Sequence, residues 1–384
     1  MIWDKVIPAK LRGLLLAFLF LLPLLHVVRQ HDHGTGFTAL LFFGPAFDAQ
    51  ALPEVRAVPH PLVGDVGYDG QFYAQLAIDP SLRHPGLATA LDNPRYRSVR
   101  IFLPALAHLL GRGRPAAILD AYALLNLCFF ALLLWTFVRF LKPSTVGHYL
   151  CLAAAAWSTG TLASVERALT DLPSAALAFL AAALAGGAIA LPVFAAALLC
   201  RESTVIALFS IAWPRAPTSK ALARAALAAL AVLLPLTAWV LYVGHIFHGA
   251  GTTTPGSLGL PFAGLLPHLR DAPSALLRAP GRLALFNLLA TLSLLVQCAH
   301  LFANPRLDSP FWRMGAPFAL LFLCFGPPLF AEQLATARAT LPLTFAFNAL
   351  LVARPGRRFL PWFLAGNAGL AFGACQMAWL LVKP

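Results

Sequence analysis

Charged residues are what this sequence has least of. Of its 384 residues, 11% are charged and 59% are hydrophobic, and the mean hydropathy is +0.76. Soluble globular domains carry about a quarter charged residues, so the composition excludes an ordinary soluble fold. Apolar runs of about 18 or more residues recur along the chain, and each is long enough to cross a bilayer. The composition therefore predicts an all-α polytopic membrane protein.

The sequence also lacks the patterns of a metal protein or a nucleic-acid binder. Its six cysteines form no CxxC pair and no Cys/His spacing typical of zinc, and all lie in apolar stretches. The net charge of +13 is spread over short loops without a Lys/Arg run or interleaved aromatic residues. We therefore expect no nucleic-acid partner. The basic loops instead indicate helix orientation and attraction to anionic membrane lipids.

The basic residues predict how the chain crosses the membrane. Lys5, Lys10 and Arg12 precede the first apolar run, so we expect a cytoplasmic N-terminus and a retained first helix at about 13–28. The chain then stays outside from about 29 to 114, on the periplasmic side of a bacterial inner (cytoplasmic) membrane. Further crossings are expected at about 115–138, 146–163, 222–244, 282–303, 314–331, 338–353 and 359–382.

One apolar stretch, 172–213, does not fit a simple hairpin. It must cross an odd number of times, yet its roughly 42 residues are long for one helix and short for three. The segment "AGGAIALP" interrupts it, so broken or re-entrant helices are expected. The predicted total is about 9–11 transmembrane helices. A second external loop is expected at about 245–281, and its segment "HGAGTTTPGSLGLP", which is rich in Gly, Pro and Thr, is predicted to be irregular.

The carboxylates are unevenly distributed. Nearly half of the fifteen acidic residues fall in the first external loop, namely Asp32, Asp48, Glu54, Asp65, Asp69, Asp79 and Asp92. Acidic residues contribute little to helix orientation, so topology does not account for this bias. The simpler interpretation of this enrichment is that external loops contact water and that water-exposed loops carry charged residues.

The stretch "VGDVGYDGQFYAQLAIDP" carries the most informative of these acids. Gly67 and Gly70 flank Asp69 in a predicted turn, and the following residues have the i, i+3, i+4 apolar spacing of an amphipathic helix. Such a helix is expected to lie flat on the membrane surface. Asp69 at its start is then placed to act as a general base on a lipid-linked substrate. The alternative is that Asp69 is only a helix N-cap.

Arginines and further acids accompany this carboxylate. "LDNPRYRSVRIFLPALA" places Asp92, Arg97 and Arg100 before an apolar helix, where guanidinium groups suit phosphate binding or interfacial snorkelling. Ionisable residues near or within membrane segments are costly and indicate function. Four of them are Asp171 in "TDLPSAALAF", Arg201 and Glu202 in "CREST", and Arg338 in "ATARATLPL". For Arg201 and Glu202 the simpler interpretation is a mutual ion pair, but adjacent helical residues point in different directions.

These motifs resemble the GT-C class of membrane glycosyltransferases. "YDGQFYAQLA" is similar to the "WDG-x-W/H-Y-x-x-I-A" segment of GPI mannosyltransferase-like members, and "TDLPSAALAF" resembles the acidic start of a later helix in that class. "CREST" resembles an "R/K-E-T" element of bacterial relatives, and "GYDGQFYAQLAIDP" together with "LDNPRYRSVRIFLPALA" resembles a bacterial group linked to cell-surface glycopolymer formation. The likeness covers about the first 210 residues. We therefore expect a GT-C-like catalytic membrane module at 1–213, including the loop 29–114 with its surface helices, followed by C-terminal transmembrane helices at 214–384.

The resemblance implies an inverting glycosyltransferase that uses a polyprenyl-phosphate sugar donor and a glycan or glycolipid acceptor. Asp69 is the expected catalytic base. The expected substrate-binding residues are Tyr68, Gln71, Tyr73, Asp92, Arg97, Arg100, Asp171, Arg201, Glu202 and Arg338. The sequence departs from the class in having Gly70 and Gln71, not a second acid, after Asp69. No metal ligands are assigned, although the resemblance leaves room for a divalent metal ion.

Two other function classes fit the same composition. A flippase or transporter of lipid-linked sugars would favour internal repeats and polar groups at the membrane midplane, whereas the acids here gather in a loop. A non-catalytic membrane subunit of a glycan assembly complex is the other alternative. Replacement of Asp69 would distinguish these two alternatives from an enzyme.

Overall fold

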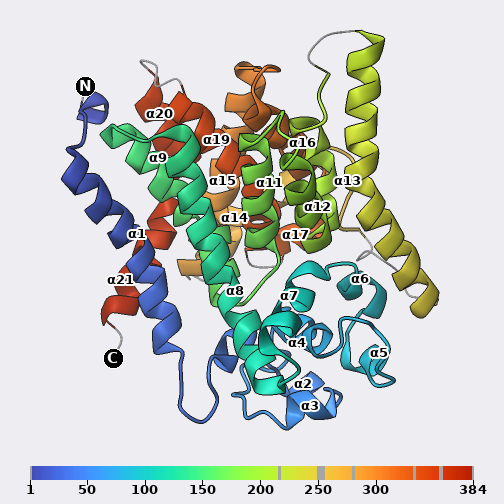
Figure 1. Cartoon of the computed structure of the whole chain (residues 1–384). Helices are drawn as coiled ribbons and strands as arrows, with labels where there is room; N and C mark the ends of the chain where they lie inside the picture. The colour runs from blue at the N-terminus through green and yellow to red at the C-terminus, as the bar shows by residue number, and fades with distance from the viewer. Residues whose placement is uncertain are drawn as a thin grey trace.

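The computed structural model describes residues 2–214, 218–248, 256–278, 282–331, 334–353 and 358–382. Helices make up 72% of it, and the described ranges contain no β-strand. The chain forms a bundle of long and short helices, and a module of short helices lies against one end of that bundle (Figure 1). This confirms the all-α prediction.

Four helices are long and apolar enough to cross a membrane. They are α1 (Ala9–Arg29), α8 (Pro115–Thr136), α13 (Ser219–Ile246) and α15 (Arg282–Ala303). Each coincides with an expected crossing. Five other apolar helices have only 10–17 residues, namely α7 (Phe102–Gly111), α9 (Val146–Ala156), α11 (Asp171–Ala183), α12 (Ala190–Cys200) and α19 (Leu341–Ala353). The number of crossings, about 9–11, therefore stays a prediction.

Several helices expected to be continuous are divided in two. The stretch 146–163 forms α9 (Val146–Ala156) and α10 (Thr159–Glu166), because Ser158 begins the second helix by accepting the amide of Thr161. The later stretches divide in the same way, into α16 (Pro310–Leu323) and α17 (Pro327–Ala331), α18 (Ala335–Ala339) and α19 (Leu341–Ala353), and α20 (Phe359–Gly366) and α21 (Leu370–Val382). The expectation of one helix in each stretch was wrong.

The stretch 172–213 is broken where the sequence indicated. Helix α11 (Asp171–Ala183) ends before the turn that contains Gly186, and α12 (Ala190–Cys200) begins after it. A 3-10 helix, Glu202–Ser210, follows. Helix α11 packs against α8, α12 and α19, which makes it the central helix of the bundle (Figure 1).

The first loop forms the module below the bundle in Figure 1. Proline at the first turn begins three of its helices, where the missing amide hydrogen is not needed. The module contains a 3-10 turn (Thr38–Leu41), α2 (Pro45–Asp48), α3 (Pro53–Arg56), α4 (Gly70–Ile78), α5 (Leu87–Ala90), α6 (Pro94–Ser98) and α7 (Phe102–Gly111). Helices α4 and α7 pack on α8, which joins the module to the bundle.

Helix α4 is not the surface helix that its spacing predicted. Every residue from Gly70 to Ala77 is buried within the protein. Its glutamines bind the backbone of the preceding loop: Gln71 accepts from the Gly44 amide at 3.0 Å, and Gln75 accepts from the Leu52 amide at 2.9 Å. Because these polar side chains are satisfied inside the protein, the helix needs neither water nor lipid on any side.

The stretch 245–281, expected to be a loop, contains a helix. Helix α14 (Leu265–Arg278) follows the segment 248–261 predicted to be irregular; the described part of that segment, 256–261, contains no helix, and 249–255 lies outside the described residues. Backbone hydrogen bonds tie the segment before α14 to the end of α16, including Gly259 N to Cys324 O at 2.9 Å. This part of the loop is therefore held against the bundle.

Candidate functional site

Asp69 immediately precedes α4, but its side chain makes no hydrogen bond to the helix N-terminus. Its carboxylate is instead paired with two arginines. Oδ1 lies 2.9 Å from Arg97 Nη2, and Oδ2 lies 3.6 Å from Arg338 Nη1. The geometry contradicts the interpretation of Asp69 as only an N-cap and makes it the junction between the loop module and the C-terminal helices.

Two glycines allow the turn around Asp69 to dock closely. Gly67 has φ +66°, and a Cβ there would lie 2.3 Å from the Phe42 carbonyl oxygen. A Cβ on Gly70 would lie 2.8 Å from the Arg167 carbonyl oxygen. Both approaches are closer than side-chain carbons tolerate, so only glycine fits. The sequence "GYDG" thus positions Asp69 through backbone contacts on both sides of it.

Arg97 and Arg100 form the part of the site contributed by the segment around α6. Arg97 donates Nε and Nη2 to the two oxygens of Asp92, at 2.8 and 2.7 Å. Arg100 binds Glu202 in the same two-pronged way, at 3.0 and 2.9 Å, and donates Nη1 to the Tyr73 hydroxyl at 2.9 Å. Parallel pairs of this kind fix the planes of both guanidinium groups.

Asp171, Arg201 and Arg338 form the part contributed by the bundle. Asp171 at the start of α11 is 3% exposed and pairs with Arg201 Nη1. Arg338 on α18 lies 3.6 Å from Asp171 Oδ2 as well as 3.6 Å from Asp69 Oδ2. Arg338 therefore bridges two carboxylates that are 102 positions apart in the sequence. Arg201 and Glu202 do not pair with each other: Arg201 meets Asp171 and Glu202 meets Arg100, as expected for adjacent residues that point in different directions.

Aromatic rings cover part of this cluster. The guanidinium carbon of Arg338 lies 5.2 Å from the centre of the Tyr68 ring, and that of Arg167 lies 4.4 Å from it. Arg100 lies 4.2 Å from the Tyr96 ring. These cation–π contacts orient the arginines while leaving their hydrogen-bonding edges to the carboxylates.

Asp69 and Glu202 are more accessible than the arginines with which they pair. The Asp69 side chain is 27% exposed and that of Glu202 is 35%, whereas Arg97, Arg100 and Arg338 are all below 10%. Partial burial raises the pKa of Asp69, but Arg97 and Arg338 lower it more, so that its pKa is about 2. Asp69 is thus ionised throughout the neutral range.

The structure brings together ten of the eleven expected site residues. Gln71 is the exception, because its amide oxygen accepts from Gly44 and its nitrogen donates to the Val66 carbonyl at 2.8 Å. Its role is to hold the turn. Sequence reasoning missed Arg167 and Tyr96 as site residues. Arg167 lies four positions before Asp171 and Tyr96 lies directly before Arg97, but only the fold shows that their side chains face the cluster.

No metal centre is apparent in the described part of the chain, where no group of three or more His, Cys, Asp or Glu side chains could hold an ion. The segment 31–33, with the sequence "HDH", leads into a tight turn: Asp32 Oδ1 accepts the Gly34 amide at 2.7 Å and the Thr35 amide at 3.2 Å. Asp79 similarly accepts amides from the turn after α4, at Ser81, Arg83 and His84. Both acids shape the backbone.

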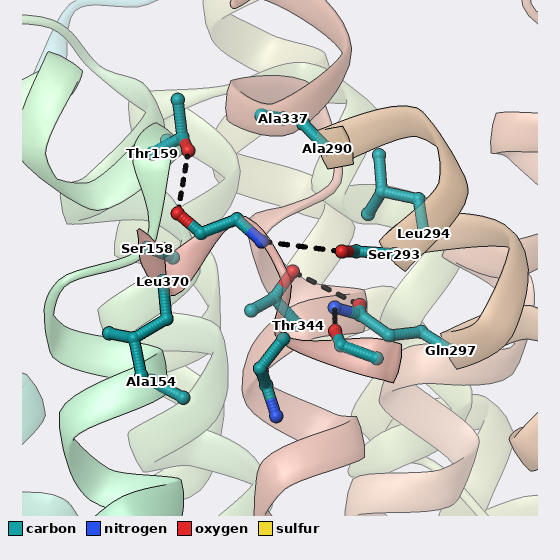
Figure 2. A pocket seen from close by; sticks show the side chains of 14 residues that line it. Ala154, Ser158, Thr159, Ala290, Ser293, Leu294, Gln297, Ala337, Thr344 and Leu370 are labelled. Carbon is teal, nitrogen blue, oxygen red and sulfur yellow. Dashed lines mark hydrogen bonds between the residues drawn. The ribbon is translucent and has the colours of Figure 1, made fainter. Parts of the chain in front are cut away.

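A second polar cluster surrounds a cavity of about 30 Å³ that Ala337 of α18 also lines (Figure 2). Thr344 donates to Gln297, which donates to the Gly366 carbonyl at 2.7 Å, and Ser293 accepts the Gly369 amide at 3.3 Å. These hydrogen bonds satisfy backbone groups at the break between α20 and α21. A helix break at membrane depth needs such partners, because lipid offers none. The cavity has room for about one water molecule, so this cluster supports the broken helices.

Comparisons with family models, with curated proteins and with solved structures find no significant match. The likeness to GT-C glycosyltransferases therefore rests on the motifs in the sequence.

Proposed function

We propose that the protein is a membrane glycosyltransferase that moves a sugar from a polyprenyl-phosphate donor to a cell-surface glycan or lipid-linked acceptor. The observation that carries the proposal is the pairing of the accessible Asp69 carboxylate with Arg97 and Arg338 at the junction of the external module and the bundle. A base and a set of cations at one place are what transfer from a lipid phosphate requires. The reaction would take place at the periplasmic face of the inner membrane.

In the proposed reaction, Asp69 accepts the proton of an acceptor hydroxyl. The hydroxyl oxygen forms a bond to the anomeric carbon while the bond from that carbon to the phosphate oxygen breaks on the opposite face of the sugar. The electron pair leaves with the lipid phosphate, whose charge Arg338 and Arg201 would balance. A lipid phosphate leaves readily, so the step needs no strong general acid.

The two arginines on Asp69 have a consequence for its basicity. With both in place its pKa is about 2, which makes it a weak base at neutral pH. The Arg338 contact is the longer of the two, at 3.6 Å. We propose that the donor phosphate draws Arg338 away from Asp69, because a phosphate offers more charge and more acceptor oxygens than one carboxylate. Loss of that neighbour would raise the pKa of Asp69 and couple donor binding to base activation.

Replacement of the base tests the proposal. Asp69→Asn keeps the side-chain shape, and we expect it to lower sugar transfer by roughly 10²–10⁴-fold at unchanged protein abundance. Asp65→Asn is the matched control, because Asp65 is exposed in the same loop. The assay uses the purified full-length protein in detergent with a labelled polyprenyl-phosphate sugar. Detergent solution has no two sides, so transfer there excludes a flippase; wild-type transfer rates in Asp69→Asn would remove Asp69 from the mechanism.

A further inference from the structure

A cavity of about 460 Å³ lies between the turn that joins α11 to α12, the residues that follow the 3-10 helix Glu202–Ser210, and the first turns of α13. Its volume falls in the range of small-molecule sites, roughly 300–1,000 Å³. Figure 1 shows that α13 begins at the end of the bundle opposite the external module. The cavity is therefore separate from the Asp69 cluster, which lies where the module meets the bundle.

Small and apolar residues make up most of the lining. Gly186 and Gly187 form part of the turn at the cavity, and alanines of α13 also line it. Trp213 adds an indole ring, and the guanidinium carbon of Arg313 lies 5.5 Å from the centre of that ring. Among the described residues of the lining, only Arg224 is charged. The space beside α13 thus combines one guanidinium group with otherwise apolar side chains.

Two positively charged side chains lie at this cavity. Arg224 lines it, and Lys220 is one helical turn earlier on the same face of α13. Within the described part of the chain, neither side chain has a hydrogen bond or an ion-pair partner. Glu202 is the only acidic residue in the sequence between 172 and 270, and Arg100 of the external module binds it. Because like charges one turn apart repel each other, an anion between Lys220 and Arg224 would be favoured.

An exposed apolar stripe continues along α13 from these cations. It consists of Leu227, Leu234 and Leu241, which follow Arg224 at i+3, i+10 and i+17 and therefore lie on one side of the helix. All three side chains are exposed on the outside of the protein. This leucine stripe would contribute nothing to the binding of a soluble anion. An acyl chain, in contrast, could lie along the stripe while its headgroup reaches Arg224.

The charges at the cavity also discriminate between classes of lipid. A zwitterionic headgroup ends in an ammonium group, which the two cations would repel. A headgroup with net negative charge neutralises them, and its phosphate oxygens can accept two hydrogen bonds from one guanidinium group. The small residues of the lining leave room for the rest of such a headgroup.

We propose that this cavity is a binding site for the headgroup of an anionic phospholipid. Arg224 binds the phosphate, Lys220 lies beside it, and an acyl chain follows the leucine stripe of α13. The orientation predicted from the basic residues places this lipid in the cytoplasmic leaflet. The proposal does not depend on the proposed function, because the site shares no residue with the Asp69 cluster.

The test is lipid binding to the purified full-length protein in detergent, measured by native mass spectrometry. The probes are phosphatidylglycerol and phosphatidylcholine with the same acyl chains. We expect one phosphatidylglycerol molecule to bind about tenfold more tightly than phosphatidylcholine. Arg224→Gln should weaken this binding about tenfold, because it removes charge-assisted hydrogen bonds. Lys220→Gln should weaken it about fivefold through the loss of one nearby charge.

A second pair of variants tests the cavity apart from the charges. Ala225 lines the cavity, whereas Ala226 is exposed on α13 outside the lining. Ala225→Leu fills the space with both cations in place and should weaken phosphatidylglycerol binding, whereas Ala226→Leu should bind as the wild type does. Lys142→Gln is the charge control, because it removes one positive charge from the segment after α8 and should also leave binding unchanged.

Each contrary result would reject a part of the proposal. Equal binding of the two lipids by the wild type would reject an anion site. Equal weakening by Lys142→Gln and Arg224→Gln would show that the basic surface attracts lipid as a whole, and normal binding by Ala225→Leu would remove the cavity from the site. Displacement of phosphatidylglycerol by an equal concentration of glycerol phosphate, which has no acyl chain, would reject the lipid in favour of a soluble anion.

Discussion

Helices α4 and α13 show opposite relations between polarity and burial. Helix α4 contains two glutamines and follows an aspartate, yet Gly70–Ala77 is entirely buried. Helix α13 is long and strongly apolar, yet only 11% of its most apolar window is buried inside the protein. In a water-soluble protein the polar helix would lie at the surface and the apolar helix would be buried. A bilayer solvates apolar side chains as well as a protein core does, so here polar groups that need partners determine what is placed inside.

The largest effect should come from breaking the buried polar network. Asp171→Ala leaves Arg201 and Arg338 without one of their carboxylates, and we expect a loss of about 3–5 kcal/mol in the free energy of unfolding. Denaturant unfolding of the full-length protein in detergent measures it. The double variant Asp171→Leu with Arg201→Met should recover much of this stability, since it removes both charges. A loss below about 1 kcal/mol for Asp171→Ala would show that the network contributes to function alone.

Close backbone packing around α4 gives a second test. A Cβ at Gly70 would meet two backbone oxygens, so Gly70→Ala should cost about 1–3 kcal/mol and displace Asp69. Gly13→Ala is the same substitution in α1, where nothing lies within 4 Å, and it should leave stability unchanged or slightly raised. Thermal unfolding of the two variants compares them; equal stabilities would contradict the tight docking of α4.

Acid should weaken the Asp69 junction. The pKa of Asp69 is about 2 in the folded protein and about 3.9 in an unfolded chain. A lowered folded pKa stabilises the protein above the unfolded value, and this stabilisation is lost as pH falls from about 4 to about 2. We expect the loss to be about 1–2 kcal/mol and to be absent in Asp69→Asn. Unfolding curves at pH 5, 4, 3 and 2 for both proteins check this; parallel curves would contradict the two-arginine pairing.

The smallest effect should come from the outer face of α13. Leu234 is 62% exposed on that face, so Leu234→Ala exchanges one lipid-solvated side chain for another and should change stability by less than about 0.5 kcal/mol. Leu133 on α8 is fully buried, and Leu133→Ala should cost about 2–5 kcal/mol. Similar costs in both, measured in the same detergent, would show that α13 packs against protein on its outer face.

The charged residues of the site could be named from the sequence because they are rare. In a chain with 11% charged residues, a carboxylate or arginine near an apolar run is conspicuous. This criterion identifies five residues that the structure places together, namely Asp69, Arg97, Asp171, Arg201 and Arg338. Gln71 was assigned to the site wrongly, because spacing along a helix does not show that an amide is occupied by the backbone of another loop.

The sequence alone determined that the chain is helical and apolar enough for a membrane, since these follow from composition and run length. It also indicated the break between α11 and α12, because the glycine pair in "AGGAIALP" disfavours a continuous helix. Only the tertiary structure decided that α4 is buried, that Asp69 is held by two arginines, and that Arg338 reaches Asp69 and Asp171 from the other end of the chain. These features depend on contacts between distant residues, and local sequence carries no signal of which distant partner a charge will meet.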